Sequence, residues 1–594
     1  MKLVVVAVLT VVVLSSGSVL KSPNDGSFEL LILHNNDMHA KFEQTSQSSG
    51  TCTSEDREAG KCYGGFPRVA HVVKEARRAA QSGEGPPVLY LNAGDTYTGT
   101  AWFTLYKWKI AAEFINALQP DAVSLGNHEF DEGVDGVVPF IRNVSAPVLA
   151  ANLILDKVPE MKDMKNLYKS IIIEKDQVKI GIIGYLTPDT KFLVPKNNVE
   201  YEDEIIAITR EVKTLKKQGV NILIALGHSG FVKDLEIARE VEDLDLVIGG
   251  HSNTFLWNDN STTEIPEVPQ GHYPTNVKQA NGRTVRVVQA YAFTKYLGKL
   301  HIKFDSEGEV IECNGDPILL NQKIPRDLEL LQIVNKYRDD VNRIYNEVVG
   351  SSDVVLNGDC RLRECNLGDF IADAMLNYTH EVYQDKYSGV SLALVQGGRI
   401  RTSIDHTGRP MILTRGDWIT VLPFSDALTI VTMNGTILKR SLEHSVSTWR
   451  AIDSSGQFLQ ISGMNVTYDL ARPVGSRVVE ARAVCSNCGN KDLRPVKDYD
   501  VYRMIMPSFI AEGGDGYTLF ASLPMVNLAY NEVDCVLYYL SKHSPVSPQL
   551  DGRIKILNEN KVSNKIANGT FSAASHKYSK VYNVILTLFL CRYI

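Results

Sequence analysis

The turn from Gly126 to Asp131 places an amide, an imidazole and a carboxylate close together, directly after an apolar run. Asn127 can offer its side-chain oxygen to a hard cation, whereas His128 must point elsewhere and is free for acid or electrostatic work. Asp131 follows His128 by three residues, so in a helical turn its carboxylate would lie beside the imidazole and favour the protonated form. An ordinary polar surface loop has a similar composition, so the rest of the chain must decide between the two interpretations.

Metal-ligand residue types also follow several other short apolar runs. Asp37 and His39 stand two positions apart at the end of one run, so both side chains leave the same face and can chelate one ion. Asp95 follows a second run and has two oxygens that could bridge two ions, while His228 and His251 follow two further runs. Mixed oxygen and imidazole ligands suit zinc, manganese or a similar divalent cation better than calcium alone.

The apolar runs before these turns have the length of strands, and several are separated by amphipathic helical stretches. Strands alternating with helices indicate an α/β domain, in which ligands gather at the carboxyl ends of the strands. A single strand-end His or Asp is more often a cap, but successive turns that all carry ligand types predict a two-metal centre. We predict strands at 30–33, 88–91, 122–125, 222–226 and 244–248, and helices at 69–81, 109–118 and 204–217.

The 594 residues exceed one ordinary core, because domains average about 150 residues. An apolar share of 44% with 22% charged residues is typical of a soluble globular protein, and the net charge of -7 gives no reason to expect nucleic acid. A small, diffusible substrate is therefore expected.

The pattern changes after an irregular, Pro-rich segment at 257–282 and a predicted strand at 285–291. A charged stretch at 327–346 is typical of a connecting helix. We therefore predict a first domain at 26–317, a linker helix region at 318–347 and a second domain at 348–557. In the second domain we expect helices at 367–378 and 436–444 and strands at 390–395, 428–432 and 500–505.

The N-terminus has the pattern of a secretory signal peptide, which we assign to residues 1–20. Its apolar run, 3–14, is shorter than the roughly 20 residues that a membrane span needs. Glycosylation sequons agree with passage through the secretory pathway, and they lie at Asn143, Asn260, Asn377, Asn434, Asn465 and Asn568. The protein is thus expected to be secreted or to lie on the extracellular face of the plasma membrane.

Nine cysteines in a secreted chain suggest disulfide bonds. Three pairs are local in sequence: Cys52 with Cys62, Cys360 with Cys365, and Cys485 with Cys488. The last pair could be half of a zinc knuckle, but no second pair of suitable spacing accompanies it, which favours a small disulfide loop.

The tail at 558–594 is polar, then has small residues at 572–575, a spacer and an apolar run at 584–591. This order resembles a lipid-anchor signal, but Arg592 ends the apolar run early. Membrane attachment through a lipid anchor and a soluble secreted form both remain open, as do a monomer and a homodimer.

Several blocks of the first domain closely resemble the calcineurin-like metallophosphoesterase domain of the 5'-nucleotidase family. The blocks are LHNNDMH (33–39), NAGDTYTG (92–99), GNHEFD (126–131), GHSG (227–230), GGHSNTF (249–255) and VVQAYAFTKYLG (287–298). The chain looks most similar to animal ecto-5'-nucleotidases and secreted apyrases. The resemblance implies an α/β fold, α+β overall, in which a four-layer metallophosphoesterase sandwich is joined by a helix to a second α/β nucleotide-binding domain.

The same resemblance implies two divalent metal ions, with zinc expected and manganese, calcium or magnesium as alternatives. It assigns Asp37, His39, Asp95 and Asn253 to one ion and Asp95, Asn127, His228 and His251 to the other. His128, supported by Asp131, would stabilise the phosphate as charge develops on it. Such paired ions activate a water and offset negative charge in an in-line displacement.

For the second domain, the resemblance implies a nucleotide site. Arg361 and Arg401 would contact phosphate, Phe424 and Phe509 would stack on a purine, Asp515 would bind the ribose, and Gln396 would lie by the base. One run departs from the family pattern Asn-Gly-Gly-Gly-Ile-Arg, since this chain has Gln396-Gly397-Gly398-Arg399-Ile400-Arg401. The base contact and the local backbone geometry are therefore left open.

The leading hypothesis is an extracellular hydrolase that converts AMP to adenosine and phosphate. An apyrase that hydrolyses ATP and ADP shares the same metal site, so the motifs do not separate the two. A catalytically silent nucleotide-binding or adhesive protein is the alternative of another class, and the complete ligand set argues against it. Arg415-Gly416-Asp417 matches a short adhesion tripeptide, but its place before Trp418-Ile419 favours the start of a structured segment.

Overall fold

The computed structural model describes residues 26–258, 265–382, 389–424, 426–450, 455–484 and 492–559. The predicted signal peptide, the sequons at Asn260 and Asn568, the pair Cys485 and Cys488, and the tail from 560 onward lie outside the described residues. Contacts divide the chain into two compact units. The first comprises the chain up to Gln47, Arg57–Thr98 and Leu105–Asp339, and the second comprises Ser48–Asp56, Gly99–Thr104 and the chain from Asp340 onward.

Two β-sheets of the first unit pack face to face, with β3 of one against β8 and β10 of the other. One sheet has the order β15-β14-β1-β2-β3-β4-β6, with β16 paired to β14, and the other has the order β12-β13-β11-β10-β8-β7. The strands of the first sheet are β1 (Phe28–Asn35), β2 (Val88–Asn92), β3 (Ala122–Ser124), β4 (Val148–Leu149), β6 (Leu167–Tyr168), β14 (Tyr296–Phe304), β15 (Val310–Gly315) and β16 (Ile318–Leu319). Those of the second are β7 (Ser170–Lys175), β8 (Val178–Leu186), β10 (Ile222–His228), β11 (Leu246–Ile248), β12 (Thr275–Lys278) and β13 (Thr284–Val288), and a separate pair is β5 (Leu153–Ile154) with β9 (Glu200–Tyr201).

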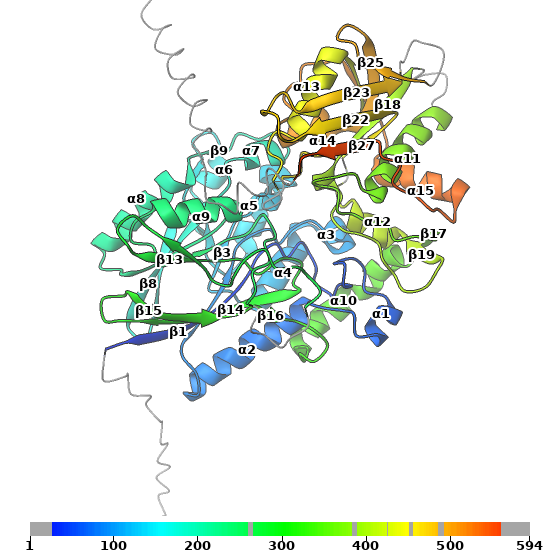
Figure 1. Ribbon diagram of the computed structural model, residues 1–594. Helices are drawn as coiled ribbons and strands as arrows, with labels where there is room; N and C mark the ends of the chain where they lie inside the picture. The colour runs from blue at the N-terminus through cyan, green and yellow to red at the C-terminus, as the bar shows by residue number, and fades with distance from the viewer. Residues whose placement is uncertain are drawn as a thin grey trace, which may run out of the picture. The chain divides into compact units, whose positions relative to one another are not determined.

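Helices cover the outer faces of these sheets (Figure 1). On one side α2 packs against β2 and α4, and on the other α8 packs against β8 while α9 packs against β11 and β13. The result is a sandwich of helix, sheet, sheet and helix, which is the four-layer α/β fold that the resemblance implied. In chain order the helices as far as the boundary after Asp339 are α1 (Ser54–Glu58), α2 (Phe66–Ser82), α3 (Ala101–Tyr106), α4 (Trp108–Leu118), η1 (His128–Phe130), α5 (Gly133–Asn143), α6 (Pro159–Lys162), α7 (Thr190–Leu193), α8 (Glu204–Lys217), α9 (Phe231–Glu240) and α10 (Leu328–Tyr345). Most of α1 and α3 belongs to the second unit.

The strands and helices predicted for the first domain are present, as β1, β2, β3, β10 and β11 and as α2, α4 and α8. Helix α8 begins where expected because the Asp203 side chain accepts a hydrogen bond from the Ile206 N–H. Two expectations were inexact. Strand β13 ends at Val288, short of the predicted end, because the chain soon turns, with Tyr291 at a left-handed φ of 58°. The segment 257–282, interpreted as irregular, contains β12.

The second unit has a central sheet in the order β21-β18-β25-β20-β26 and a smaller one in the order β24-β23-β22-β27. Alternate residues of β18 enter different cores: Ala393 and Val395 join one cluster, while Leu392 and Leu394 join the other. The central sheet is therefore buried on both faces, which its near-continuous apolar strands predict. Helix α10, which corresponds to the connecting helix predicted at 327–346, contains the boundary between the two units.

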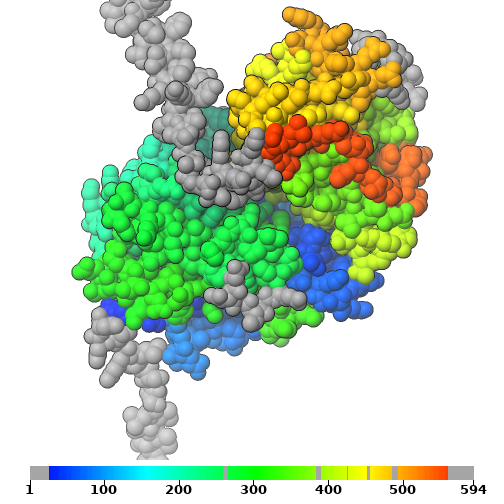
Figure 2. Space-filling view, viewed as in Figure 1, coloured from blue at the N-terminus to red at the C-terminus, as the bar shows by residue number. Residues whose placement is uncertain are grey.

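The elements of the second unit match the expected mixture of helices and strands. Strand β27 lies at the surface, in red in Figure 2. The strands are β17 (Val348–Ser352), β18 (Val390–Gln396), β19 (Met411–Thr414), β20 (Leu428–Asn434), β21 (Leu459–Ser462), β22 (Met464–Asp469), β23 (Val478–Val484), β24 (Leu493–Pro495), β25 (Val501–Pro507), β26 (Met525–Asn527) and β27 (Ile554–Leu557). The helices are α11 (Asn366–Val382), η2 (Gly397–Arg399), α12 (Arg415–Val421), α13 (Gly435–Ser445), α14 (Ser508–Ala511), η3 (Gly514–Gly516) and α15 (Glu532–His543).

Disulfide bonds occur where local spacing predicted them. Cys360 and Cys365 are bonded to each other, with their Cα atoms 5.2 Å apart, and Cys52 and Cys62 are both disulfide-bonded. Within the ranges described above, no helix is long and apolar enough to cross a membrane.

The tripeptide Arg415-Gly416-Asp417 begins helix α12, as its sequence context favoured. The side chain of Asp417 is 2% exposed and accepts hydrogen bonds from the backbone N–H and the hydroxyl of Thr414, both at 2.8 Å. The Asp417 carboxylate is therefore buried and used in a capping box with Thr414. It is not exposed to a partner protein, so the structure contradicts the adhesion interpretation.

Candidate functional site

The predicted ligands of the first unit lie on loops at the carboxyl ends of strands. Asp37 follows β1, Asp95 follows β2, Asn127 follows β3, His228 ends β10, and His251 follows β11. Strands β1, β2 and β3 are parallel neighbours, and so are β10 and β11, so in each sheet these loops emerge at one edge. The structure thereby brings together residues that are far apart in sequence.

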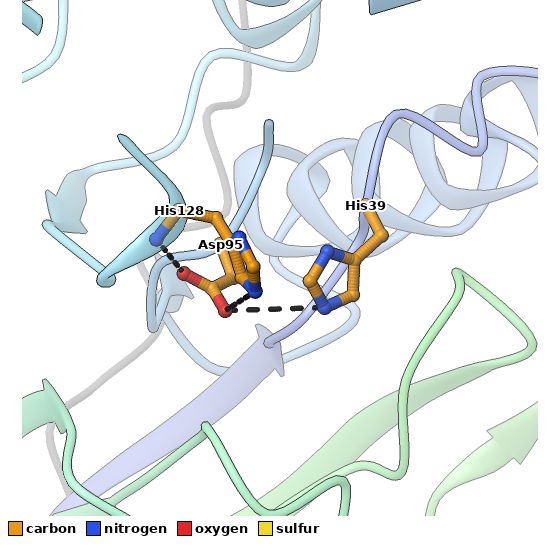
Figure 3. A group of neighbouring side chains, drawn as sticks. All are labelled: His39, Asp95 and His128. Atoms are coloured by element: carbon orange, nitrogen blue, oxygen red, sulfur yellow. Dashed lines mark hydrogen bonds and ion pairs between the residues drawn. The ribbon is translucent and has the colours of Figure 1, made fainter. Parts of the chain in front are cut away.

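Asp95 occupies the centre of this cluster. One of its oxygens, Oδ2, lies 2.8 Å from Nε2 of His228 and 3.9 Å from Nε2 of both His39 and His128. The other oxygen, Oδ1, accepts a hydrogen bond of 2.9 Å from the backbone N–H of His128. Figure 3 shows His39 and His128 converging on this carboxylate. A carboxylate so placed can serve groups on both of its sides.

Asp37 links the two halves of the cluster. Its Oδ1 lies 3.8 Å from Nε2 of His39 and 3.6 Å from Nε2 of His228. Its carboxylate also accepts from the backbone N–H of His251, whose ring nitrogen Nδ1 lies 2.9 Å from the side-chain oxygen of Asn127. Donor atoms of Asp95, His228 and His251 all lie within 4.8 Å of one another, a span that one ion can bridge.

The ligand loops have unusual backbone geometry. Five predicted ligands have φ in the left-handed region, namely Asp37 (50°), His39 (47°), Asp95 (56°), His251 (79°) and Asn253 (54°). Non-glycine residues rarely adopt this conformation, and it costs of order 1 kcal/mol or more at each position. Gly126 is needed for a different reason, since a Cβ there would lie 2.1 Å from Oδ1 of Asp95. Such strain is typical of functional sites.

The electrostatics of the cluster favour a cation. Burial raises the pKa of Asp37 despite the opposing effect of His228. Burial also opposes ionisation of Asp95, but His228, His128 and His39 together hold the pKa of Asp95 well below its usual range. Burial alone would lower the pKa of His228, whereas Asp95 and Asp37 raise it to about 10. The negative potential that holds a proton on His228 would equally attract a metal ion.

The chemistry of the donor set fits a pair of divalent ions. Carboxylate, amide and imidazole donors are all present at one edge, and mixed sets of this kind bind transition-metal ions. The side-chain oxygen of Asn253 is buried and has no hydrogen-bond partner among the described residues. A buried amide oxygen without a partner is costly, and a metal ion would satisfy it. Asn253 therefore fits its predicted role as a further ligand.

His128 has the contact with Asp131 that its spacing predicted. His128 is the first residue of the short helix η1 and Asp131 follows the last one, and Nδ1 of His128 lies 2.8 Å from Oδ2 of Asp131. The carboxylate thus orients the ring and leaves Nε2 facing Asp95. Nε2 could donate to a phosphate when the ring is protonated, or bind an ion when the ring is neutral, and donor atoms of His39, Asp95 and His128 indeed lie within 4.8 Å.

Glu129, which the residue pattern did not single out, anchors the Asp95 loop. It is 1% exposed and accepts hydrogen bonds from the backbone N–H groups of Asp95, Thr96 and Gly126, at 3.0, 2.7 and 2.7 Å. Burial and the neighbouring Asp95 raise the pKa of Glu129 to about 7. Its position within the GNHEFD block was the available signal.

A buried network that sequence reasoning also missed supports the loop carrying His251 and Asn253. Gln289 donates to Asp234 at 2.7 Å and to the carbonyl of Gly250 at 3.0 Å, and it accepts from the N–H of Thr254 at 3.0 Å. The Tyr185 hydroxyl donates to the other Asp234 oxygen at 2.7 Å. Such secondary contacts fix the orientation of ligand loops.

In the second unit, the predicted substrate residues gather at one end of the central sheet. Gln396 ends β18, Phe509 follows β25, and Phe424 precedes β20. Strand β25 pairs parallel to β18 and antiparallel to β20, with Leu428 opposite Pro507, so all three positions lie at the same edge. This edge is again the carboxyl end of parallel strands, where α/β folds bind ligands.

The other candidates of the second unit, Arg361, Arg401 and Asp515, pack close to this same edge. A Cβ on Gly397 would lie 2.2 Å from the Cys360 carbonyl and 3.0 Å from Cα of Arg361, so glycine lets the disulfide loop approach. A Cβ on Gly456 would lie 3.0 Å from Cα of Gly398 and 3.4 Å from Oδ2 of Asp515. The carbonyl of Asp515 accepts from Nε2 of His444 at 2.7 Å. The guanidinium of Arg401 lies 6.0 Å from the ring centre of Phe424.

Arg399, which replaces a glycine of the family pattern, fits without backbone strain. It lies in the 3-10 helix η2, a conformation open to any L-residue. Its side chain is 2% exposed and turns toward Glu532 and Asp426. The local geometry that the sequence left open is therefore ordinary at this position.

Two family models match the chain. The calcineurin-like phosphoesterase model matches residues 30–255, and the model of the 5'-nucleotidase C-terminal domain matches residues 348–522. The four-layer fold and its ligand-bearing edge, together with the first of these matches, define a metal-dependent phosphoesterase.

Similarity over nearly the whole chain narrows the class. The chain is 44% identical to Protein 5NUC of Lutzomyia longipalpis over 90% of its own length and 94% of that protein. It is 41% identical to the 5'-nucleotidase of Homo sapiens over 95% of each chain. The crystal structure of the 5'-nucleotidase precursor from Thermus thermophilus matches with a TM-score of 0.80 at 31% identity, covering 90% of this chain and 100% of that one. The chain belongs to the 5'-nucleotidase family.

Proposed function

We propose that this protein hydrolyses nucleoside 5'-monophosphates, with AMP, converted to adenosine and phosphate, as the leading substrate. The observation that carries the proposal is the convergence of carboxylates and imidazoles from several strand ends on Asp95. The family is one of metal-dependent phosphohydrolases, and the relatives named 5'-nucleotidase align along almost the whole chain.

The residues of the first unit would divide the work as the resemblance implied. Asp37, His39, Asp95 and Asn253 would hold one divalent ion, and Asp95, Asn127, His228 and His251 the other. When bound, such a pair supplies a Lewis acid and a water of lowered pKa. The Nε2–H of His128 would donate a hydrogen bond to a phosphate oxygen as negative charge develops there, and Asp131 would hold the imidazole ring in the required orientation.

The residues of the second unit would recognise the nucleotide. Arg361 and Arg401 would bind phosphate oxygens, Phe424 and Phe509 would stack on the base, and Asp515 would bind the ribose hydroxyls. The Gln396 side-chain oxygen is buried and has no hydrogen-bond partner within the described part of the chain. An amino group such as that of adenine would satisfy this acceptor, which supports a place for Gln396 beside the base.

We propose zinc as the metal, because imidazole nitrogens accompany the oxygen ligands, with manganese, calcium and magnesium as the competitors to test. We also propose that the protein acts outside the cell, since it carries disulfide bonds behind a predicted signal peptide. A lipid anchor and a homodimer are not part of this proposal.

Phosphate release from AMP, ADP and ATP by the purified protein tests the proposal. We expect AMP to give the highest kcat/KM, with adenosine as the product. Faster release from ATP and ADP, with AMP accumulating, would instead make the enzyme an apyrase. An absence of release from all three, with each of the four metals supplied, would overturn the proposal.

A further inference from the structure

Arg399 is a buried cation with a fixed set of partners in the second unit. It forms an ion pair with Glu532 through Nε and Nη2, the latter at 3.1 Å, and Nη1 donates to Asp426 at 2.6 Å. Arg399 is 2% exposed and Glu532 is 0% exposed, so each would be costly to bury without the other. A bidentate contact of this kind holds the planar guanidinium in one orientation.

Glu532 gives this arrangement a rigid base. It is the first residue of α15, whose N-terminus is closed by a capping box between Asn531 and Asp534. A carboxylate in the first turn is also favoured by the helix dipole. The orientation of the Arg399 side chain is thus set by helix α15, more than a hundred residues later in the chain, and not by the short helix η2 that carries Arg399.

The Arg399 guanidinium also contacts Phe424. Nη2 of Arg399 donates to the Phe424 carbonyl at 3.4 Å, and the guanidinium carbon lies 5.2 Å from the centre of the Phe424 ring. The first contact restrains the backbone at Phe424, and the second restrains its ring through a cation–π interaction. Both contacts come from one residue, so the position and the tilt of the ring are restrained together.

We propose that Arg399, held by Glu532, is a positioning residue that presents the Phe424 ring to the base and so sets the affinity for the nucleoside part of the substrate. The inference rests on the proposed function, in which Phe424 stacks on the base. An aromatic ring held in place before binding loses less conformational freedom when the base arrives, which strengthens stacking. Arg399 and Glu532 are not among the residues proposed to bind the metal ions or the phosphate, so phosphate binding and the hydrolytic step should change little when this ion pair, the Arg399 brace, is removed.

The test removes both members of the ion pair together, because a single change would leave an unpaired buried charge. In the full-length protein, the double variant Arg399→Met/Glu532→Met should raise the KM for AMP about fivefold to tenfold. This increase corresponds to the loss of part of the binding that stacking on the base provides. The kcat and the inhibition constant of inorganic phosphate, a ligand without a base, should stay within about twofold. The matched control is Arg409→Met with Asp405→Met, an exposed pair at 3.4 Å in the same unit, which should change neither constant.

A double-mutant cycle identifies the route of the effect. Phe424→Ala alone should raise the KM for AMP about tenfold, and removal of the brace in the Phe424→Ala background should add no further increase. Equal weakening of AMP and inorganic phosphate, or a full additional increase in the Phe424→Ala background, would overturn the inference. Absence of AMP hydrolysis by the unmodified protein would instead overturn the proposed function, so the two failures are distinguishable. A thermal midpoint of the double variant close to that of the unmodified protein confirms that the fold is retained.

Discussion

Both units contain buried charges close to their predicted binding residues, but the partners of these charges differ in kind. In the first unit, Asp37 and Asp95 lie against imidazoles, whose positive charge depends on protonation. In the second, the buried Glu532 lies against Arg399, whose charge is permanent. The first cluster has a charge that a bound cation can balance, whereas the second is already balanced by the protein.

The backbone differs in the same way. Several predicted ligands of the first unit have left-handed φ values, whereas Arg399 lies in a 3-10 helix and Glu532 in an α-helix. Strain and conditional charge together indicate a cluster shaped for a metal ion, while an ordinary backbone and fixed partners indicate support for a neighbouring residue. Buried charge alone therefore does not identify a reactive site. The nature of its partners does.

Removal of Asp95 should give the largest effect, because this carboxylate is predicted to serve both ions. Asp95→Ala should lower kcat/KM for AMP by about 10³-fold or more. Phosphate release and metal content by mass spectrometry measure the two consequences, and at least one ion should be lost. Asp135→Ala, an exposed carboxylate on α5, is the control. Retained activity in Asp95→Ala would contradict the claim that the charged cluster of the first unit is the catalytic metal site.

Replacement of His128 should separate catalysis from metal binding. His128→Ala should lower kcat by about 10²–10³-fold, as expected for a group that stabilises developing charge, while both ions remain bound. The exposed His301 on β14 provides the control, His301→Ala, which should behave like the unmodified protein. Loss of one ion from His128→Ala would show that His128 is a ligand, as its distance of 3.9 Å from Asp95 also permits.

Truncation of Phe509 should affect binding and spare the chemical step. Phe509→Ala should raise the KM for AMP about tenfold with little change in kcat, because base stacking contributes roughly 1–3 kcal/mol. Steady-state kinetics measures both constants. Phe192→Ala, on α7, removes a ring that is 43% exposed and serves as the control. A fall in kcat of the same size as the rise in KM would mean that the two units do not divide binding and chemistry as proposed.

The smallest effect concerns stability and the balanced charges of the second unit. Burial alone would lower the pKa of His406, but the contact with Asp417, at 3.0 Å, raises it above the usual value. A raised folded-state pKa stabilises the fold fully below the unfolded pKa of about 6.5, and this stabilisation is lost as pH rises through the folded value. When the pH is raised from below about 6.5 to above the raised pKa of His406, the thermal midpoint should therefore fall by about 2–4 °C more in the unmodified protein than in His406→Asn.

His543→Asn, which changes an exposed histidine on α15, should keep the pH dependence of the unmodified protein. The same slope in His406→Asn would show that the pair with Asp417 does not titrate as its surroundings imply. The pKa of Asp417 is lowered despite burial, because His406 and the Thr414 N–H favour the carboxylate, so its own contribution is lost only at acid pH.

The convergence of the predicted ligands at one edge of the first unit could be anticipated largely from residue types, because strand-end residues such as Asp95 and His228 meet in an α/β sandwich of this order. The His128 contact with Asp131 followed from helical spacing alone. The supporting residues could not be found in this way. Asp234 and Gln289 are 55 residues apart, and only the pairing of strands brings them together.

The second unit was less accessible to sequence reasoning. A phenylalanine is usually a core residue, so Phe424 and Phe509 were singled out by family resemblance, and their roles remain predictions. The partner of Arg399 lies 133 residues away, so the sequence showed a departure from the pattern without its consequence. In the first unit, likewise, a tight turn after Val288 ended a strand whose apolar pattern continued further.

The central claim is that AMP hydrolysis depends on two divalent ions held around Asp95. Its most direct test strips the full-length protein with a chelator and then adds zinc, manganese, calcium or magnesium in measured amounts, while phosphate release from AMP and bound metal are followed together. Activity should disappear on stripping, return with at least one of the metals, and reach its maximum at about two bound ions per chain. Full activity in protein that holds no measurable metal would contradict the account.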